Sequence, residues 1–509
     1  MRIALLLSLT LLCACSTTNN SVLKLQTTRN IDYQLLAKVR TTPKLAQVPA
    51  CKEGFNVNDV EDGYFRIRKR WQLLNNCLYS DQGSRKLVVL LDGTENTKKD
   101  NTNIWRMYNQ ALEQARNGAR VIPYYDKGVA TSITTPFGSV FGSGVSLNIR
   151  QAYRFLTEAY KPGDEIYIFG FSRGAFTARS LNGFIEIAGL PKKLKADARD
   201  DSTLWGWTGH MHNMVKGMYD IYKSRNDGVP GFDDDLRGLV KEYRKRHNIL
   251  VYGEEPKDQN EKQVVVKVIG VFDTVPAVGA KLKEEPDEHR LELYAERGYH
   301  AMSLDEQRAS FRLLRFGLPQ TKSQVLEEVW FAGVHADVGG GYLNDPDAAG
   351  CGESPYAKGG QGLETIPLRW MLANVSDAGI FANSSSWPAE CIGGPLHDEF
   401  HDATGLTHVA YKKAGLIRRK PVERDKVHAS VFLRMDKRDL PVPHPQREPK
   451  PEFRYDPINL GYARRDRCLK ADLARNYSIV GTYEPNCPKT NGLGRKATNN
   501  DAVILESPQ

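Results

Sequence analysis

The sequence predicts an α/β fold with a mostly parallel β-sheet covered by helices on both faces. Three observations lead to this prediction: apolar runs of strand length, helical patterns between them, and turn residues at their ends. The apolar runs lie at 86–91, 121–125, 165–169, 264–272 and 329–334. The helical patterns lie at 103–116, 146–160, 175–188 and around 304–314. Because a helical crossover brings the chain back to the end of the sheet where the previous strand began, the next strand runs parallel to it.

The elements follow one another with recognisable boundaries. The first strand ends at the sequence DGT over 92–94, and the helix after it stops at Asn117-Gly118. The second strand is followed by a Gly/Ser-rich stretch over 138–144, which predicts a loop. The third strand enters its helix through the sequence GFSRG over 170–174. The last two strand runs end at Asp273 and His335.

Two stretches interrupt this alternation: residues 195–262 and the region over 375–509. Residues 195–262 are rich in aromatic and basic residues, with Trp205, Trp207 and three methionines. They predict either a lid or membrane-facing patch, or side chains packed onto the domain. The predicted organisation is a signal peptide at 1–15, a tether and N-terminal segment at 16–82, an α/β domain at 83–374 with an insertion at about 195–262, and a C-terminal accessory region at 375–509.

The first fifteen residues predict export and a lipid anchor. Met1-Arg2 precedes a mostly apolar run, and the sequence LCAC over 12–15 resembles a bacterial lipobox. Cys15 would then be the lipid-bearing first residue of the mature protein. Ser16 after it resembles an outer-membrane sorting residue, so we expect a lipid-anchored protein in the outer membrane or periplasm of a Gram-negative bacterium. A plain signal peptide or a misplaced start is the alternative.

The composition fits a globular, exported chain. The 509 residues are 40% hydrophobic and 26% charged, which excludes disorder for most of the chain. The sequence contains no run of 18 apolar residues, so no transmembrane helix is predicted. The net charge of +9 is too dilute to indicate nucleic acid, but it suits an anionic lipid surface. Without a C-x-x-C motif, disulfides are favoured over zinc, with buried free thiols as the alternative. The cysteines concerned are Cys51, Cys77, Cys351, Cys391, Cys468 and Cys487.

The sequence GFSRG predicts a nucleophilic serine. A G-x-S-x-G match alone is weak, but here a strand pattern ends just before it and a helix begins just after it. In such a turn Gly170 and Gly174 allow tight closure and Ser172 stands above the sheet edge. The N–H of Arg173 would point toward a developing oxyanion. The alternative is that Ser172 caps an ordinary helix.

A nucleophilic serine needs a base and a carboxylate that orients the base. Asp273 and His335 end the two later strand runs, and the carboxyl ends of parallel strands meet at one edge. The sequence therefore predicts a triad of Ser172, Asp273 and His335. Asp305 and Asp337 are rivals for the carboxylate, and a structural loop histidine is the alternative for His335.

The turn after the first strand is the candidate for the second oxyanion donor. The N–H of Gly93 or of Thr94 would supply it, and a plain turn is the alternative. Phosphatases with an aspartyl nucleophile also carry D-G-T after a strand, but they need another Asp where this chain has Leu90. The acidic run over 233–235 lacks the spacing of a calcium loop. No metal and no cofactor is predicted.

Six segments together make the chain resemble the G-x-S-x-G phospholipase effectors of type VI secretion. They occur in the family's order over roughly residues 86–371, and the family's triad falls on Ser172, Asp273 and His335. The segments are LVVLLDGTENT (87–97), AYRFLTEAYKPGDEIYIFGFSRGAFTARSLNGFI (152–185), VIGVFDTVPAVG (268–279), HAMSLDEQR (300–308), VWFAGVHADVGGGY (329–342) and GLETIPLRWM (362–371). The resemblance implies an α/β-hydrolase fold and phospholipase A-type hydrolysis of glycerophospholipids.

The expected partner is a phospholipid membrane surface rather than nucleic acid. The resemblance adds type VI secretion components or an immunity protein. Because the family's effectors carry no signal peptide, the lipobox-like start favours action in the cell's own envelope as an alternative to an effector role. Two further functions stay open: a general esterase or thioesterase, because a triad does not read the leaving group, and a non-catalytic binding or scaffold protein on a hydrolase fold.

Overall fold

A computed structural model describes most of the predicted α/β domain and parts of the regions around it. The described residues are 64–79, 83–94, 96, 100–128, 139–192, 210–224, 232–254, 264–276, 292–342, 362–401, 411–422, 424–436, 455, 457, 459–460 and 478–481. The predicted signal peptide, with Cys15, and most of the segment over 16–82 lie outside the described residues. Trp205 and Trp207 lie outside them as well.

Eight strands form one sheet, and each neighbouring pair is parallel. Their order is β2-β1-β3-β4-β5-β6-β7-β8, so the predicted α/β class with a parallel sheet is confirmed. The strands are β1 (Lys86–Leu91), β2 (Val121–Asp126), β3 (Glu165–Phe171), β4 (Val266–Phe272), β5 (Ala295–Ser303), β6 (Val325–Phe331), β7 (Lys426–His428) and β8 (Ser478–Val480). The last two come from the region over 375–509 and extend the same sheet.

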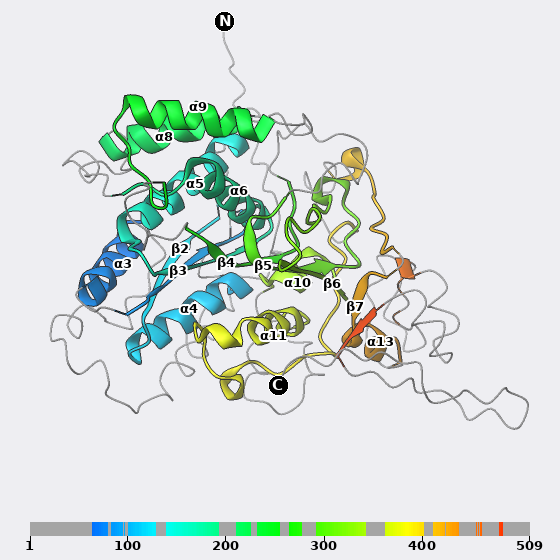
Figure 1. Cartoon of the computed structure of the whole chain (residues 1–509). Coiled ribbons are helices and arrows are strands. Elements are labelled where there is room, and N and C mark those ends of the chain that lie inside the picture. Colours follow the sequence, from blue (N-terminus) through cyan, green and yellow to red (C-terminus); the bar gives the residue numbers. More distant parts are fainter. Residues whose placement is uncertain are drawn as a thin grey trace, which may run out of the picture.

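Helices cover both faces of this sheet (Figure 1). α5 and α6 lie on one face, and α4 and α11 lie on the other. α4 packs on β1 and β2, whereas α6 packs on β3 and β4. The helices are α3 (Tyr64–Tyr79), α4 (Asn103–Arg116), α5 (Ser139–Ala159), α6 (Arg173–Ala188), α8 (His210–Lys223), α9 (Phe232–Arg246), α10 (His335–Gly339), α11 (Thr365–Asn374) and α13 (Ala429–Asp436), with short 3-10 turns η3 (Ala309–Phe311), η5 (Ser376–Ala378) and η6 (Ser384–Ser386).

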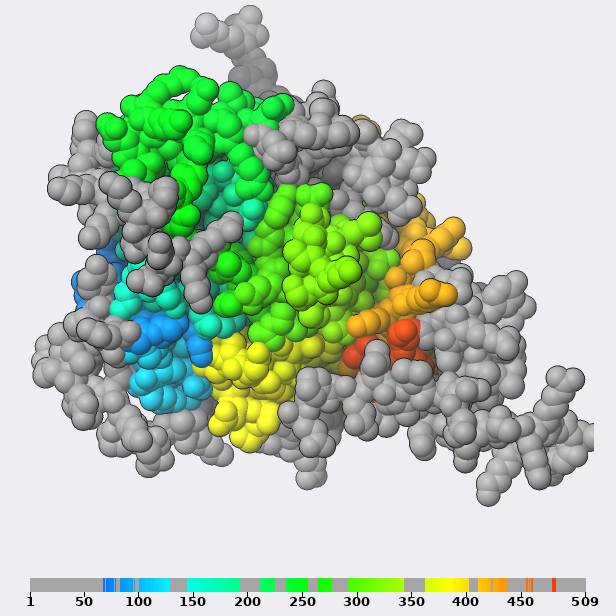
Figure 2. Space-filling model, viewed as in Figure 1, coloured from blue at the N-terminus to red at the C-terminus, as the bar shows by residue number. Residues whose placement is uncertain are grey.

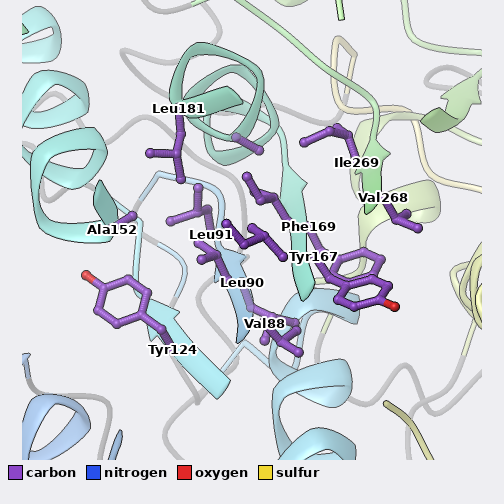
Figure 3. Packing of buried hydrophobic residues seen from close by; sticks show 14 of the residues in the cluster. Val88, Leu90, Leu91, Tyr124, Ala152, Tyr167, Phe169, Leu181, Val268 and Ile269 are labelled. Atoms are coloured by element: carbon purple, nitrogen blue, oxygen red, sulfur yellow. The ribbon is translucent and has the colours of Figure 1, made fainter. Parts of the chain in front are cut away.

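The core centres on β1 and its neighbour β3. Because helices cover both faces, β1 is apolar at successive positions, and residues 87–91 are at most 1% exposed. Each fully buried Leu or Val there contributes about 1.5–3 kcal/mol. Figure 3 shows Leu91 facing the side on which Ala152 of α5 and Leu181 of α6 lie. This packing fixes the carboxyl ends of β1 and β3, where the strand order reverses. Such reversal points are common ligand sites in α/β sheets.

Two element predictions are wrong. The stretch over 138–144, predicted as a loop, contributes to α5, which begins at Ser139. The helix predicted around 304–314 is absent there, where the described chain has only the short turn η3. Leu304, Phe311 and Leu314 are buried at a spacing that mimics one helix face. The strand β5 just before them was missed because its first half is polar: its Glu296 pairs with Lys267 at 2.6 Å.

The insertion packs onto the domain as a helical pair. α8 contacts α5 and α6, and α9 contacts α6 and α8; Figure 2 shows the pair in green at the top of the view. Met211, Met214 and Met218 are all buried. For these methionines the lid or membrane-facing patch is wrong, because their side chains form the contact between the insertion and the domain. The expectation of disulfides is met at Cys391, which is disulfide-bonded.

Candidate active site

Ser172 lies in a sharp turn between β3 and α6. Its φ is 60° and its ψ is −126°, a conformation that residues other than glycine rarely adopt. Its side chain makes no capping hydrogen bond to α6. Ser172 thus occupies the N-cap position of α6 without capping the helix through its hydroxyl. Strained backbone of this kind costs about 1–3 kcal/mol and is concentrated at functional sites.

The glycines on either side of Ser172 are required by close backbone contacts. A Cβ on Gly170 would lie 2.5 Å from the carbonyl oxygen of Gly174. A Cβ on Gly174 would overlap the carbonyl oxygens of Leu91 and Asp92, at the end of β1. Both predicted elbow glycines thus let the turn close against the neighbouring strand.

Asp273 and His335 form a buried hydrogen-bonded pair. The Nδ1 of His335 lies 2.6 Å from an Oδ of Asp273, and neither side chain is exposed. Asp273 follows β4 directly, and its own φ of 42° is again positive. His335 begins α10 after β6, and its ring contacts the rings of Phe171 and Phe311 at centroid distances of 4.7 and 4.9 Å. Two of the predicted triad residues are therefore brought together directly.

The backbone places Ser172 beside this pair. The strands β3 and β4 are neighbours with Phe171 opposite Phe272, and the N–H of Ser172 donates to the carbonyl of Phe272 at 3.0 Å. Ser172 and Asp273 are thus the first residues beyond two adjacent strand ends. The Nε2 of His335 is buried and has no hydrogen-bond partner among the described residues. The bond from Ser172 Oγ to this nitrogen is not formed in the structure, and such bonds often tighten only when substrate binds.

An arginine from the C-terminal region completes the surroundings of Asp273. A guanidinium nitrogen of Arg419 lies 2.5 Å from the Asp273 oxygen that does not face His335. The backbone N–H of Ser303 donates to that same oxygen at 2.9 Å. The sequence analysis missed Arg419, because it lies in a basic, Pro-rich stretch without a periodic pattern.

The charges set the protonation states of the pair. Burial alone would raise the pKa of Asp273, but Arg419 and His335 outweigh it and hold that pKa well below its usual range. Burial lowers the pKa of His335, and the hydrogen bond to Asp273 only partly opposes this. At neutral pH the site therefore holds an ionised carboxylate and a neutral imidazole, which is the form a general base needs.

The turn after β1 lies next to Ser172, and its two candidate oxyanion donors, Gly93 and Thr94, differ in the hydrogen bonds they already make. A Cβ on Gly93 would lie 3.3 Å from the Cβ of Ser172, so the turn after β1 borders the serine. The N–H of Gly93, however, donates to the carboxyl group of Asp92 at 2.8 Å. The hydroxyl of Thr94 is buried and unpartnered within the described chain. Burial raises the pKa of Asp92 to about 7, despite hydrogen bonds from Thr102, Tyr125 and Gly93.

The rival carboxylates contact other groups. Asp305 accepts from the N–H of Gly333 at 2.6 Å and from the hydroxyl of Tyr455 at 2.7 Å. Asp337 pairs with His397 rather than with His335, at 2.6 Å. Neither replaces Asp273 as the partner of the His335 ring.

The described residues give no sign of a bound metal or of a membrane span. Among them, no three His, Cys, Asp or Glu side chains gather so that they could hold a metal ion. In the same ranges, no helix has the length and apolarity needed to cross a bilayer.

Comparison with known proteins identifies a family for the domain that carries this site. The family described as "T6SS, Phospholipase effector Tle1-like, catalytic domain" matches residues 85–374, more than half of the chain. The uncharacterized protein YEL023C of Saccharomyces cerevisiae is 29% identical over 264 residues, covering 48% of this chain and 34% of that protein. An uncharacterized protein from Pseudomonas aeruginosa is a structural match with a TM-score of 0.34 and 16% identity, covering 66% of this chain and 51% of that one.

Proposed function

This chain belongs to the Tle1-like family of type VI secretion phospholipase effectors, and from that premise we propose that it is a serine-dependent phospholipase A-type enzyme. Its substrates would be the acyl esters of glycerophospholipids. The observation that carries the proposal is the buried His335 ring, whose Nδ1 is held by Asp273 and whose Nε2 has no partner within the described chain. A buried ring nitrogen without a partner costs stability, and its position beside the Ser172 turn gives it a chemical use.

In the proposed reaction, neutral His335 accepts the Ser172 proton at Nε2 while Oγ attacks the acyl carbonyl carbon. Asp273 holds the ring tautomer and stabilises the imidazolium. The tetrahedral intermediate collapses, the ester C–O bond breaks, and the leaving lysophospholipid oxygen takes the proton from Nε2. Water then attacks the acyl-enzyme by the same proton transfers and releases the fatty acid. No cofactor enters this scheme.

We assign the oxyanion donors to the backbone N–H of Arg173 and to the side-chain hydroxyl of Thr94, in place of a backbone N–H of the turn after β1. Arg173 is the first residue of α6, where backbone N–H groups favour negative charge. Thr94 is favoured over Gly93 because the Gly93 N–H is already donated to Asp92, whereas the Thr94 hydroxyl is buried without a partner in the described ranges. One such donor typically lowers the barrier by about 2.7–4 kcal/mol.

The setting of the enzyme is proposed from the sequence. Cys15 as a lipid anchor would hold the enzyme at the cell envelope, against a phospholipid surface. Membership of the family supports type VI secretion components or an immunity protein as partners. A general esterase or thioesterase remains the second candidate, because the triad geometry does not select the leaving group.

The test uses the full-length chain in detergent, offered vesicles of phosphatidylethanolamine and phosphatidylglycerol. Mass spectrometry would follow free fatty acid and lysophospholipid. We expect both products from the native protein and a loss of about 10⁶-fold in Ser172→Ala, the scale found for removing a nucleophile. Ser385→Ala is the matched control, because Ser385 is exposed on η6.

The outcomes separate the candidate functions. Cleavage of short p-nitrophenyl esters that depends on Ser172, without release from vesicles, would replace the phospholipase by a general esterase. An active Ser172→Ala variant would rule out Ser172 as the nucleophile. No hydrolysis of either substrate by the native protein would favour a binding protein on a hydrolase fold.

A further inference from the structure

Arg419 is a buried side chain whose guanidinium group makes its hydrogen bonds beside Asp273 and His335. One of its guanidinium nitrogens contacts Asp273 at 2.5 Å, the Ser303 hydroxyl at 2.5 Å and the Ser303 carbonyl at 3.0 Å. The other terminal nitrogen donates to the carbonyl of Phe311 at 2.6 Å. Phe311 in turn packs on the His335 ring. A residue more than 140 positions from Asp273 thus fixes both sides of the pair.

These contacts divide the two oxygens of Asp273 between two tasks. Arg419 and the Ser303 N–H share one oxygen, and His335 takes the other. The carboxylate therefore cannot rotate about its Cβ–Cγ bond without breaking these three hydrogen bonds. Its second oxygen stays aimed at Nδ1, which fixes the ring tautomer and leaves Nε2 as the proton acceptor.

The charge of Arg419 has a separate effect. Asp273 is fully buried, and a buried carboxylate without a cation tends to take up a proton. Arg419 keeps it ionised. Besides burial, the charge of Arg308 acts directly on the ring and lowers the pKa of His335. The charge of Arg419 acts in the same direction by partly neutralising the carboxylate that would stabilise an imidazolium.

We propose that Arg419 is a positioning residue of the catalytic centre: it orients the Asp273 carboxylate, and its charge keeps His335 available as a neutral base at acidic pH. This inference rests on the proposed function only in taking His335 as the base. It assigns part of the active site to the region beyond residue 375, outside the segment matched by the family.

Other charged groups also face the pair and stay in place in every variant considered. The Glu306 carboxylate accepts from the backbone N–H of His335 at 3.3 Å and is itself paired with Arg308 at 2.6 Å. His300 on β5 donates from Nδ1 to the Glu328 carboxylate at 3.0 Å, and its Nε2 accepts from the N–H of Thr274 beside Asp273 at 3.1 Å. Because these groups are unchanged, a shift in pH dependence after a substitution at 419 reports on Arg419.

The kinetic test compares two substitutions at one position. Arg419→Gln removes the charge, so we expect the acid limb of kcat/KM to move upward by about one pH unit or more. Arg419→Lys keeps the charge but loses the planar fork, so we expect the limb in place and kcat lower by about tenfold. Arg418→Gln is the matched control, because Arg418 is exposed and adjacent. An equal loss of activity at every pH in Arg419→Gln would show a merely structural role and overturn the proposal.

A second readout does not require turnover. NMR titration of ¹⁵N-histidine-labelled protein, with the His335 signal assigned through His335→Gln, follows the ring in the resting enzyme. We expect the His335 midpoint to rise in Arg419→Gln and to stay near the native value in Arg419→Lys. An unchanged midpoint in a folded Arg419→Gln protein would overturn the inference even if the enzyme is active. A shifted midpoint in a protein that hydrolyses no ester would sustain it while the proposed function fails.

Discussion

Two histidine–aspartate pairs each contribute one residue to α10, and their surroundings differ. In both pairs Nδ1 lies 2.6 Å from a carboxylate oxygen. The first pair, His335 with Asp273, is fully buried, whereas the His397 side chain of the second is 24% exposed. A short hydrogen bond alone therefore does not identify a catalytic histidine.

The surroundings of the two rings make the distinction. His397 stacks on Tyr342 at 3.6 Å with an interplanar angle of 19°, and its Asp337 also accepts the N–H groups of Val334 and His397. These contacts are those of a group that fastens a loop to α10. The His335 pair instead has a cation behind the carboxylate and a buried Nε2 without a partner in the described chain. This is the arrangement that the proposed general base requires.

The largest expected effect separates the two histidines. His335→Gln should lower kcat by about 10⁶-fold, because the serine then has no base. His397→Gln should change kcat by less than about tenfold, because it removes a partly exposed contact. Both variants would be assayed on phospholipid vesicles, with thermal unfolding as a check of folding. The reverse order of losses would make His397 the base.

The next effect separates the two carboxylates. Asp273→Asn should lower kcat by about 10⁴-fold, because the amide permits the wrong imidazole tautomer. Asp337→Asn should leave the rate within about tenfold but reduce the free energy of unfolding by about 1–3 kcal/mol, because three N–H groups lose a charged acceptor. The measurements are kcat and urea unfolding of both variants. A rate loss of similar size in the two would show that the pairs act together.

Much of this site was predictable because it lies at strand ends. Ser172, Asp273 and His335 each follow an apolar run, and the carboxyl ends of parallel strands share one edge. The same rule predicted the turn after β1 beside the serine, where the structure has Gly93. The sequence favoured Asp273 but left Asp305 and Asp337 as rivals, because the pairing with His335 depends on side-chain direction in the folded chain.

Arg419 and β5 could not be found by pattern. Arg419 reaches Asp273 from a segment without helical or strand period, and a single buried arginine has no sequence signature. β5 is covered by neighbours on both sides, yet it carries charges at its start, where they pair across the sheet. In both cases a partner distant in the chain offsets the polar group, and such partners are visible only in the fold.

A third buried histidine, His428, has a hydroxyl rather than a carboxylate at its Nδ1, and so shows what burial does to a ring without a carboxylate partner. His428 at the end of β7 is buried, stacks on Phe331 at 4.8 Å, and has the Ser430 hydroxyl 2.9 Å from its Nδ1. Burial lowers its pKa to about 4. The unfolded chain would titrate near 6.5, so between these values the unfolded state binds more protons. This group's contribution to stability is therefore complete above about pH 6.5 and is lost as the pH falls toward 4.

The expected size follows from that interval, at about 1.4 kcal/mol for each pH unit, which gives on the order of 3 kcal/mol by pH 4. His428→Phe keeps the ring stack and removes the titration, so its stability should fall less than that of the native protein between pH 7 and pH 4.5. Urea unfolding at the two values measures the difference, with His401→Gln as the exposed control. The carboxylates titrate alike in all three proteins, so their contribution cancels when the pH-dependent losses of stability are compared. A native protein and His428→Phe that lose stability in parallel would mean that His428 is already protonated in the fold, with Ser430 or another group holding the charge.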